Sequence, residues 1–234
     1  MKELLLQLNN LDFSPLFISL KTGIIATFIC FFLGIFAARE VIKLNNKVKA
    51  IVDGILTLPM VLPPTVAGFF LLLIFSLRRP FGIFLKGQLN IQVVQSGLGC
   101  VLAAVVIAFP LMYRNARGAF EQVDRNLIYA GRTLGMSETA IFFKIIIPSA
   151  GPGVASGTIL TFARAIGEYG ATSMVAGNIL GKTGTISQRI AMVIQNGDYY
   201  TAGIWVVIIM IIAFLIIVLM NIVTSKSFKN VRKY

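Results

Sequence analysis

The sequence predicts an all-α integral membrane protein with five strong transmembrane helices and room for a sixth. Of its 234 residues, 57% are hydrophobic and the mean hydropathy is +0.86, which leaves too few polar residues to cover a soluble domain of this length. Five apolar stretches are long enough to cross a hydrocarbon core of about 30 Å as helices, and their continuity excludes the alternating strands of a barrel. They are Leu16–Ala38, Ile51–Leu77, Gly97–Tyr113, Ser149–Gly167 and Gly203–Thr224.

The distribution of charge predicts the orientation of these helices. The net charge is +12, and 13 of the 21 Lys and Arg residues lie in the segments 39–49, 114–144 and 226–233. Because basic residues accumulate on the cytoplasmic side of membranes, we expect the N-terminus outside and the C-terminus inside, with no nucleic-acid partner. The expected divisions are an extracytoplasmic N-terminus (1–14), a membrane domain (15–224) with a cytoplasmic coupling loop (114–148), and a basic cytoplasmic tail (225–234).

The first apolar stretch is expected to be a retained helix rather than a cleaved signal peptide. Its positive charges follow the apolar run, and no A-x-A cleavage site is present. Lys21, inside the stretch, can extend its ammonium group to the outer interface. Cys30 and Cys100 lie in apolar stretches without metal-ligand spacing, so we expect both to be packing residues.

The second apolar stretch contains three prolines, Pro59, Pro63 and Pro64. Each removes a backbone donor and leaves a carbonyl group that needs a partner within the membrane. Two interpretations follow from this pattern. One is a kinked helix of the kind that membranes tolerate, and the other is a broken helix that forms part of a polar path or gate, with the Thr65 hydroxyl as a nearby donor.

The cytoplasmic loop after the third stretch is predicted to contain two short helices. Apolar residues recur there at helical spacing: Leu127, Tyr129 or Ala130, Leu134, Ile141 and Ile145. Gly135 and Met136 separate the two helices. Ser137 can cap the second helix, and Pro148 marks the start of the fourth membrane stretch. The first helix, residues 124–134, is either a solvated amphipathic face or a docking surface with basic flanks.

Arg164 and Glu168 lie four residues apart on one helix face, near the outer end of the fourth stretch. A charge inside the bilayer costs about 2.5–3.5 kcal/mol on insertion scales, so such residues usually pair or face water. One interpretation is a mutually neutralising pair. The other is a face that borders a polar path through the membrane, with Thr158, Thr161 and Arg164 as hydrogen-bond donors.

The segment after the fourth stretch is predicted to lie outside and resembles a phosphate-binding loop only superficially. The spacing G-x-x-x-x-G-K-[ST] fails because Ala176, not glycine, stands five residues before Gly181. Asn178 and Lys182 are instead expected in an outer loop, which either meets another protein or is simply solvated. Residues 185–195 have an apolar face and are the candidate sixth helix, at or dipping into the outer interface.

The chain lacks the groups that an intramembrane enzyme would need. It has no histidine, and among its nine acidic residues Asp53 and Glu168 are those in or beside apolar stretches. No G-x-S-x-G motif occurs, and neither paired intramembrane acids nor inverted repeats indicate an ion-gradient transporter. We therefore expect no catalytic residue, cofactor or metal site in this chain.

The cytoplasmic loop resembles the coupling signature of ABC importer permeases, E-A-A-x-x-x-G-x9-I-x-L-P. The matching residues are Ala130, Gly135, Ile145 and Pro148, and the departures are Tyr129 for glutamate, Gly131 for the second alanine and Ile147 for leucine. The resemblance implies that the first short helix docks in a cleft of a cytoplasmic ATPase. The residues expected at this contact are Asp124, Arg125, Leu127, Tyr129, Ala130, Gly131, Arg132, Leu134 and Gly135.

Longer motifs resemble those of the molybdate permeases within this superfamily. They are VDGILTLPMVLPPTVAGFFLLL (Val52–Leu73), FPLMYRNARGAFEQVD (Phe109–Asp124) and FARAIGEYGATSMVAGNILGKTGTIS (Phe162–Ser187). Tungstate and sulfate permeases share versions of several of these motifs. The short chain and the run from Glu168 to Thr172 favour the molybdate branch.

The resemblance implies a type I ABC importer permease fold and the membrane subunit of an ATP-driven molybdate importer. The alternatives are the same machine for tungstate or sulfate and, in a different class, an ion-gradient transporter. Five helices cannot enclose a gated polar path, so we expect two copies around a two-fold axis. The implied partners are two cytoplasmic ATPases, which bind ATP and Mg, and an extracytoplasmic oxyanion-binding protein.

Overall fold

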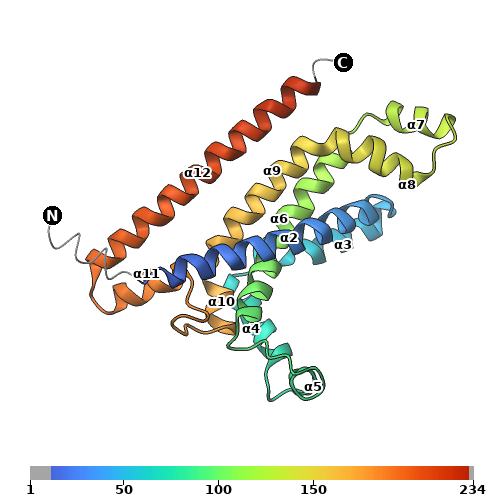
Figure 1. Cartoon of the computed structure of the whole chain (residues 1–234). Helices are drawn as coiled ribbons and strands as arrows, with labels where there is room; N and C mark the ends of the chain where they lie inside the picture. Colours follow the sequence, from blue (N-terminus) through green and yellow to red (C-terminus); the bar gives the residue numbers. More distant parts are fainter. Residues whose placement is uncertain (1–11, 232–234) are drawn as a thin grey trace.

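The computed structural model describes residues 12–231, with side chains described as far as residue 222. Within this range the chain is helical and contains no β-strand (Figure 1). Among the described residues, four helices are long and apolar enough to cross a membrane, and a bent pair of helices provides a fifth crossing if it is counted as one span. The predicted all-α membrane fold is confirmed.

Three long helices form the centre of the molecule: α2 (Ser14–Ile42), α6 (Gly97–Glu121) and α9 (Ile147–Ile166). Glycines allow them to approach closely. A Cβ atom at Gly34 of α2 would lie 2.7 Å from Cγ of Met112 on α6, and a Cβ atom at Gly157 of α9 would lie 2.6 Å from Cβ of Asn115. The tight packing of these helices fixes the framework on which the functional segments are mounted.

The third span is longer than predicted, because α6 continues past Tyr113 to Glu121. An ion pair between Arg117 and Glu121 (3.0 Å) stabilises the added turns. Phe120 is buried there and packs edge-to-face on Phe142 with ring centres 5.5 Å apart. The predicted end of this span was therefore too early, and the connection to the next helix is short.

The second apolar stretch is a helix broken in its middle, and it provides the predicted second span if its two halves are counted as one. α3 (Asn46–Val61) and α4 (Pro64–Phe75) meet at an angle of 106°. Between them Leu62 and Pro63 are extended, with ψ angles of 144° and 134°. Pro63 and Pro64 have no N–H group to continue the helical hydrogen bonds, whereas Pro59 is accommodated inside α3. Of the two interpretations, the break is the one observed.

Two short helices that the sequence did not predict lie beside α4: α5 (Pro80–Leu89) and α10 (Gly170–Val175). α10 packs closely on α4 through glycines from both helices. A Cβ atom at Gly68 would lie 2.7 Å from Cα of Ala171, and one at Gly170 would lie 3.0 Å from Cβ of Pro64. This contact places the break between α3 and α4 against the segment that follows α9.

The fourth span is helical from Glu138 to Ile166, and so begins about three turns earlier than the predicted Ser149. It consists of α8 (Glu138–Ile141), the π-helical turn η1 (Phe142–Ile146) and α9. The N–H group of Ala140 donates to Oγ of Ser137 at 3.2 Å, which confirms the predicted cap. Pro148 does not mark the start of a separate helix as predicted. It follows the π-helical turn within the continuous helix that runs from Glu138 to Ile166.

The candidate sixth helix is present as α11 (Ile186–Gln195) but does not span the membrane. Its 10 residues are about 15 Å long, roughly half the thickness of a hydrocarbon core. It begins with a capping box between Thr185 and Gln188 and packs on α2 and on α12 (Tyr199–Val231). Residues 185–195 are therefore helical as predicted, but they form a short helix packed on the bundle and not a sixth span.

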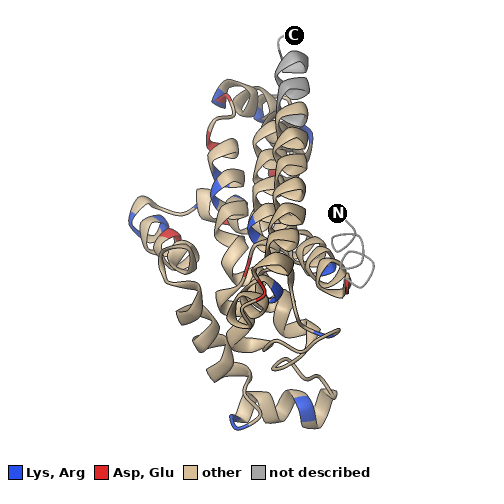
Figure 2. Cartoon of the chain, turned by 90° about the vertical axis from the view of Figure 1, so that its left-hand side faces the viewer, with Lys and Arg blue, Asp and Glu red and all other residues tan. Residues whose placement is uncertain are grey.

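Charge is concentrated at helix ends and in connecting segments, with long uncharged stretches of helix between them (Figure 2). α12, which stands apart from the bundle over much of its length (Figure 1), carries no Lys or Arg between residues 199 and 222. Its exposed apolar side chains include Phe214 and Leu215. These surfaces are suited to lipid or to another membrane helix.

Candidate docking helix and charge clusters

The helix α7 (Arg125–Thr133) lies in the predicted coupling loop and has well-defined ends. At its start, Oδ1 of Asp124 accepts the N–H of Asn126 at 2.9 Å. At its end, Gly135 has a φ angle of +74°, and the N–H groups of Gly135 and Met136 donate to the carbonyls of Arg132 (2.9 Å) and Gly131 (3.0 Å). This is a Schellman motif, which explains why glycine is needed there.

One side of α7 is fastened to the fourth span. Gly131 is buried, and a Cβ atom there would lie 2.9 Å from Cδ1 of Ile145 and 3.2 Å from Cγ1 of Ile141. Two nitrogens of Arg132 donate to the carboxylate oxygens of Glu138 at 2.7 and 3.2 Å. This hydrogen bonding raises the pKa of Arg132. α7 is therefore fixed to the same continuous helix that forms the fourth span.

The remaining surface of α7 is uncovered, and we call its exposed residues the docking face. Leu127, Tyr129 and Leu134 are 48%, 54% and 80% exposed, and Ala130 and the basic Arg125 are exposed with them. Exposed apolar side chains on a short, rigid helix outside the membrane spans are typical of a surface that binds another protein. The structure thus brings the predicted coupling residues together, with Gly131 and Arg132 used to anchor the helix.

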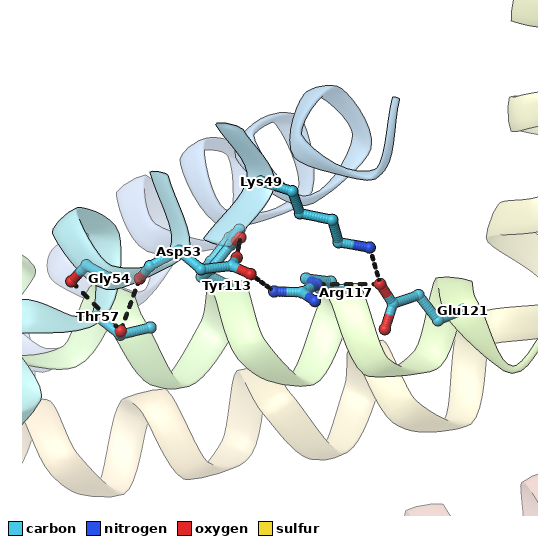
Figure 3. A network of polar contacts seen from close by, with 7 residues as sticks. All are labelled: Lys49, Asp53, Gly54, Thr57, Tyr113, Arg117 and Glu121. Carbon is cyan, nitrogen blue, oxygen red and sulfur yellow. Dashed lines mark hydrogen bonds and ion pairs between the residues drawn. The ribbon is translucent and has the colours of Figure 1, made fainter. Parts of the chain in front are cut away.

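A second polar site, which the sequence did not predict, joins α3 to α6; we call it the α3–α6 network (Figure 3). Asp53 of α3 accepts hydrogen bonds from the hydroxyl of Tyr113 and the guanidinium of Arg117 on α6. Nε of Arg117 also donates to Oε1 of Glu121 at 3.0 Å, and the ammonium of Lys49 pairs with the same oxygen. Five side chains from two helices therefore form one connected set of contacts.

The sequence shows the four-residue spacing of the charged residues within each helix, but not which residues pair between the two helices. Lys49 and Asp53 are four residues apart on one helix, as are Arg117 and Glu121 on the other, so each pair lies on one face. Their alignment across two helices depends on the path of the chain through α4 and α5. In the sequence alone, Asp53 is an isolated acid beside an apolar stretch.

Arg164 and Glu168 form the ion pair expected from their spacing. NH1 of Arg164 lies 2.8 Å from Oε2 of Glu168, whose side chain is 2% exposed. The other oxygen, Oε1, accepts the N–H of Ala171 at 2.8 Å, in the first turn of α10. Both carboxylate oxygens thus have partners, so Glu168 fixes the corner between α9 and α10.

The structure brings this corner next to the proline break. Through Gly170, the corner contacts Pro64 and the backbone of Thr65, whose side chain is exposed together with Pro63. The two threonines of α9 that the sequence analysis named lie farther from this corner, toward the start of the helix. The hydroxyl of Thr161, which is fully buried, donates to Gly157 O at 2.7 Å, and that of Thr158, half-buried, donates to Val154 O at 2.8 Å.

The loop between α10 and α11 is ordered by hydrogen bonds rather than shaped for phosphate. Oγ1 of Thr183 accepts the N–H of Ile179 (2.9 Å) and donates to the carbonyl of Gly177 (3.2 Å). Nε2 of Gln188 donates to the same carbonyl at 2.9 Å. Asn178 and Lys182 are exposed on this loop, as expected of residues on a contact surface or in solvent.

A cavity of about 600 Å³ lies between the last turns of α6 and the first turns of α9, beside the base of α7. Its lining is largely apolar, and its polar members include Arg114, Asn115, Gln122, Asp124 and Ser149. The arginine, amide and hydroxyl groups can donate to an anion or to its hydration water, whereas the carboxylate of Asp124 can accept from water. The cavity lies on the side of the bundle that carries the docking face.

Comparisons with known proteins agree with this arrangement. The sequence matches the family described as "Binding-protein-dependent transport system inner membrane component" over residues 31–229. It is 40% identical over 189 residues to molybdenum transport system permease protein ModB of Escherichia coli K12, covering 81% of this chain and 82% of that protein. ModB of Haemophilus influenzae is 36% identical over 186 residues, which cover 80% of this chain and 81% of that protein.

A solved structure shares the fold. A chain from the inward-facing conformations of the MetNI methionine ABC transporter superposes with a TM-score of 0.70, covering 91% of this chain and 94% of that one. The sequence identity is 17%, so this likeness concerns the fold alone.

Proposed function

The chain belongs to the family of binding-protein-dependent transport system inner membrane components, and we propose that it forms the translocation path of an ATP-driven molybdate importer. It is a multi-pass inner membrane protein and a non-catalytic permease subunit. Molybdate is the proposed substrate because the relatives described above, at 36% and 40% identity over most of the chain, are molybdenum transport permeases. The sequence motifs Val52–Leu73 and Phe162–Ser187 support the same choice.

The docking face of α7 is the observation that carries the proposed mechanism. We infer that two cytoplasmic ATPases, which hold ATP and Mg, each receive one α7 helix in a cleft. Leu127, Tyr129 and Leu134 provide exposed apolar contacts, and Arg125 is free of the Glu138 contact that engages Arg132. Because α7 is anchored to a continuous membrane helix, closure of the ATPases on ATP would displace that helix.

A homodimer follows from the need for a path and from the uncovered faces of the bundle. α3 has no fully buried residue, and Ile51, Ile55 and Val61 are 64%, 64% and 81% exposed. We propose that a second copy covers part of these faces around a two-fold axis and that lipid covers the rest. The N-terminus would lie outside and the C-terminus in the cytoplasm, as the distribution of basic residues predicts.

The path itself is proposed to run past the proline break and to reach the cytoplasm through the cavity beside α7. Pro63, Pro64 and Thr65 lie at the break, next to the corner fixed by Arg164 and Glu168. Thr158 belongs to the proposed path as a half-buried donor, whereas Thr161 has no exposed surface in this conformation. Asn178 and Lys182 on the outer loop are proposed to meet the oxyanion-binding protein.

Reconstitution tests this function. The chain would be purified with its ATPase and placed in vesicles with the binding protein outside, and accumulation of molybdate would be followed. We expect uptake that requires both ATP and the binding protein, with tungstate and sulfate added as competitors to rank selectivity. A complex that carries sulfate but not molybdate would contradict the proposed substrate. Accumulation that is driven by an ion gradient and needs no ATP would contradict the proposed mechanism.

A further inference from the structure

α3 is attached to the bundle largely through polar groups. It contributes no fully buried residue, and its partly buried apolar contacts to the core come from Val52 and Leu56. The α3–α6 network adds Asp53, paired with Arg117, and Lys49, paired with Glu121 (Figure 3). Hydrogen bonds between charged groups are directional and roughly twice as strong as neutral ones. The network therefore fixes where α3 lies along α6.

The far end of α3 is a hinge point. After Val61 the chain is extended through Leu62 and Pro63 and turns by 106° into α4. The N–H of Leu62 is the last to join the α3 ladder, donating to Leu58 O at 3.2 Å. A displacement of α3 would therefore change the angle at this break before it disturbed α4, which is packed tightly on α10 through Gly68.

The same network lies next to the docking helix in sequence. Glu121 is the last residue of α6, and α7 begins four residues later, at Arg125. The connection is held in place, since Val123 is buried and its N–H donates to Phe120 O at 3.3 Å. A force applied to α7 thus reaches the last turns of α6, where Arg117 and Glu121 hold α3.

We propose that the α3–α6 network is the link through which movement of the docking helix reaches the proline break. Asp53, Arg117, Glu121 and Lys49 act as positioning residues: they contact no substrate and set the angle between α3 and α4. The hydrogen bonds and ion pairs of the α3–α6 network stay intact while the ATPases move, so α3 is displaced together with α6. This inference rests on the proposed function, and it adds a second route beside the direct connection of α7 to the fourth span.

Removal of one charge provides the first test, in the complete complex of permease, ATPase and binding protein. In Asp53→Asn we expect molybdate carried per ATP hydrolysed to fall about tenfold, while hydrolysis and complex assembly change little. Asp53→Glu, which keeps the charge, should retain most of the coupling. The matched control is Glu40→Gln, which breaks an exposed pair with Lys43 (2.7 Å) on α2 and should leave coupling unchanged.

A cross-link provides the second test and does not depend on the stability of one variant. In an Asp53→Asn background, Lys49→Cys with Glu121→Cys removes both ion pairs that join α3 to α6, and Cys30 and Cys100 are fully buried, so a short bifunctional thiol reagent should react at the new positions. We expect low coupling before reaction and restored coupling after it, because the covalent bridge replaces the ionic link.

The outcomes separate this inference from the proposed function. Three outcomes would each overturn the proposed link. The first is normal coupling in Asp53→Asn, and the second is a loss of assembly and ATP hydrolysis in that variant that Asp53→Glu does not restore. The third is coupling that stays low after the cross-link has formed. If the wild-type complex carried no anion at all, the proposed function would fail and this inference with it.

Discussion

The two charge clusters of this protein are built differently. Arg164 and Glu168 are four residues apart, and the second carboxylate oxygen is taken by a backbone N–H three residues on, so the whole cluster belongs to one corner of the chain. The α3–α6 network joins residues 60 to 72 positions apart, such as Asp53 and Tyr113, and its side chains are partly exposed. The first cluster stabilises a local shape, whereas the second sets the relation between two helices.

This difference predicts where substitutions affect stability and where they affect coupling. A buried carboxylate that loses its cation is costly, because desolvation is no longer compensated. A network with several partners loses less when one member is removed, since the others remain paired.

The largest effect on stability is expected from Arg164→Met. It leaves the carboxylate of Glu168 buried without its cation, at a cost of about 3–5 kcal/mol. Thermal unfolding of the purified protein in detergent would show this as a strongly lowered Tm. The double variant Arg164→Met with Glu168→Gln should recover much of the loss, and a Tm as low as that of the single variant would contradict the pairing.

The same double variant also decides between the two interpretations of Arg164. If the pair only neutralises itself, the recovered protein should carry molybdate close to the wild-type rate. If Arg164 borders the path, uptake should stay low although the Tm is recovered, because the donor to the anion is missing.

A smaller effect on stability is expected from Asp53→Asn, about 1–2 kcal/mol, because Arg117 keeps its contact with Glu121. The Tm should fall less than in Arg164→Met, even though molybdate uptake falls more steeply than stability explains. A Tm loss equal to that of Arg164→Met would indicate that the two clusters are not distinct in kind.

The smallest effect is expected from Tyr113→Phe. The ring remains buried against Phe109, with which it stacks at 6.1 Å, and one hydrogen bond to Asp53 is lost. We expect a change of about 1 kcal/mol in stability and nearly normal coupling, as Asp53 keeps Arg117. A loss of coupling as large as in Asp53→Asn would show that the hydroxyl, rather than the ion pair, sets the position of α3.

Features with local signals were predictable from the sequence. Gly135 and Ser137 mark the end of α7 and the start of α8, and both act as expected. The prolines indicated the break, and the spacing of Arg164 and Glu168 indicated their pair. The resemblance to ABC importer permeases is confirmed by the family match over residues 31–229.

Features that depend on tertiary contacts were not predictable in this way. Hydropathy ended the third span at Tyr113, because it does not register that the charges of Arg117 and Glu121 satisfy one another on a continuing helix. It could not give the 106° angle at the break, nor bring Asp53 opposite Arg117, since both depend on how helices far apart in the sequence pack together.

The most direct measurement is ATP-driven molybdate uptake and ATPase co-purification when the docking face is made polar, with Leu127→Asp and Tyr129→Asp combined. Both side chains are exposed, so the fold should persist, and Leu180→Asp, at an exposed leucine on the opposite side, should keep the ATPase bound. We predict that the α7 variant loses its ATPase and its uptake together. A complex that still binds the ATPase and carries molybdate at the wild-type rate would contradict the role of α7 as the point where the force of the motor enters this protein.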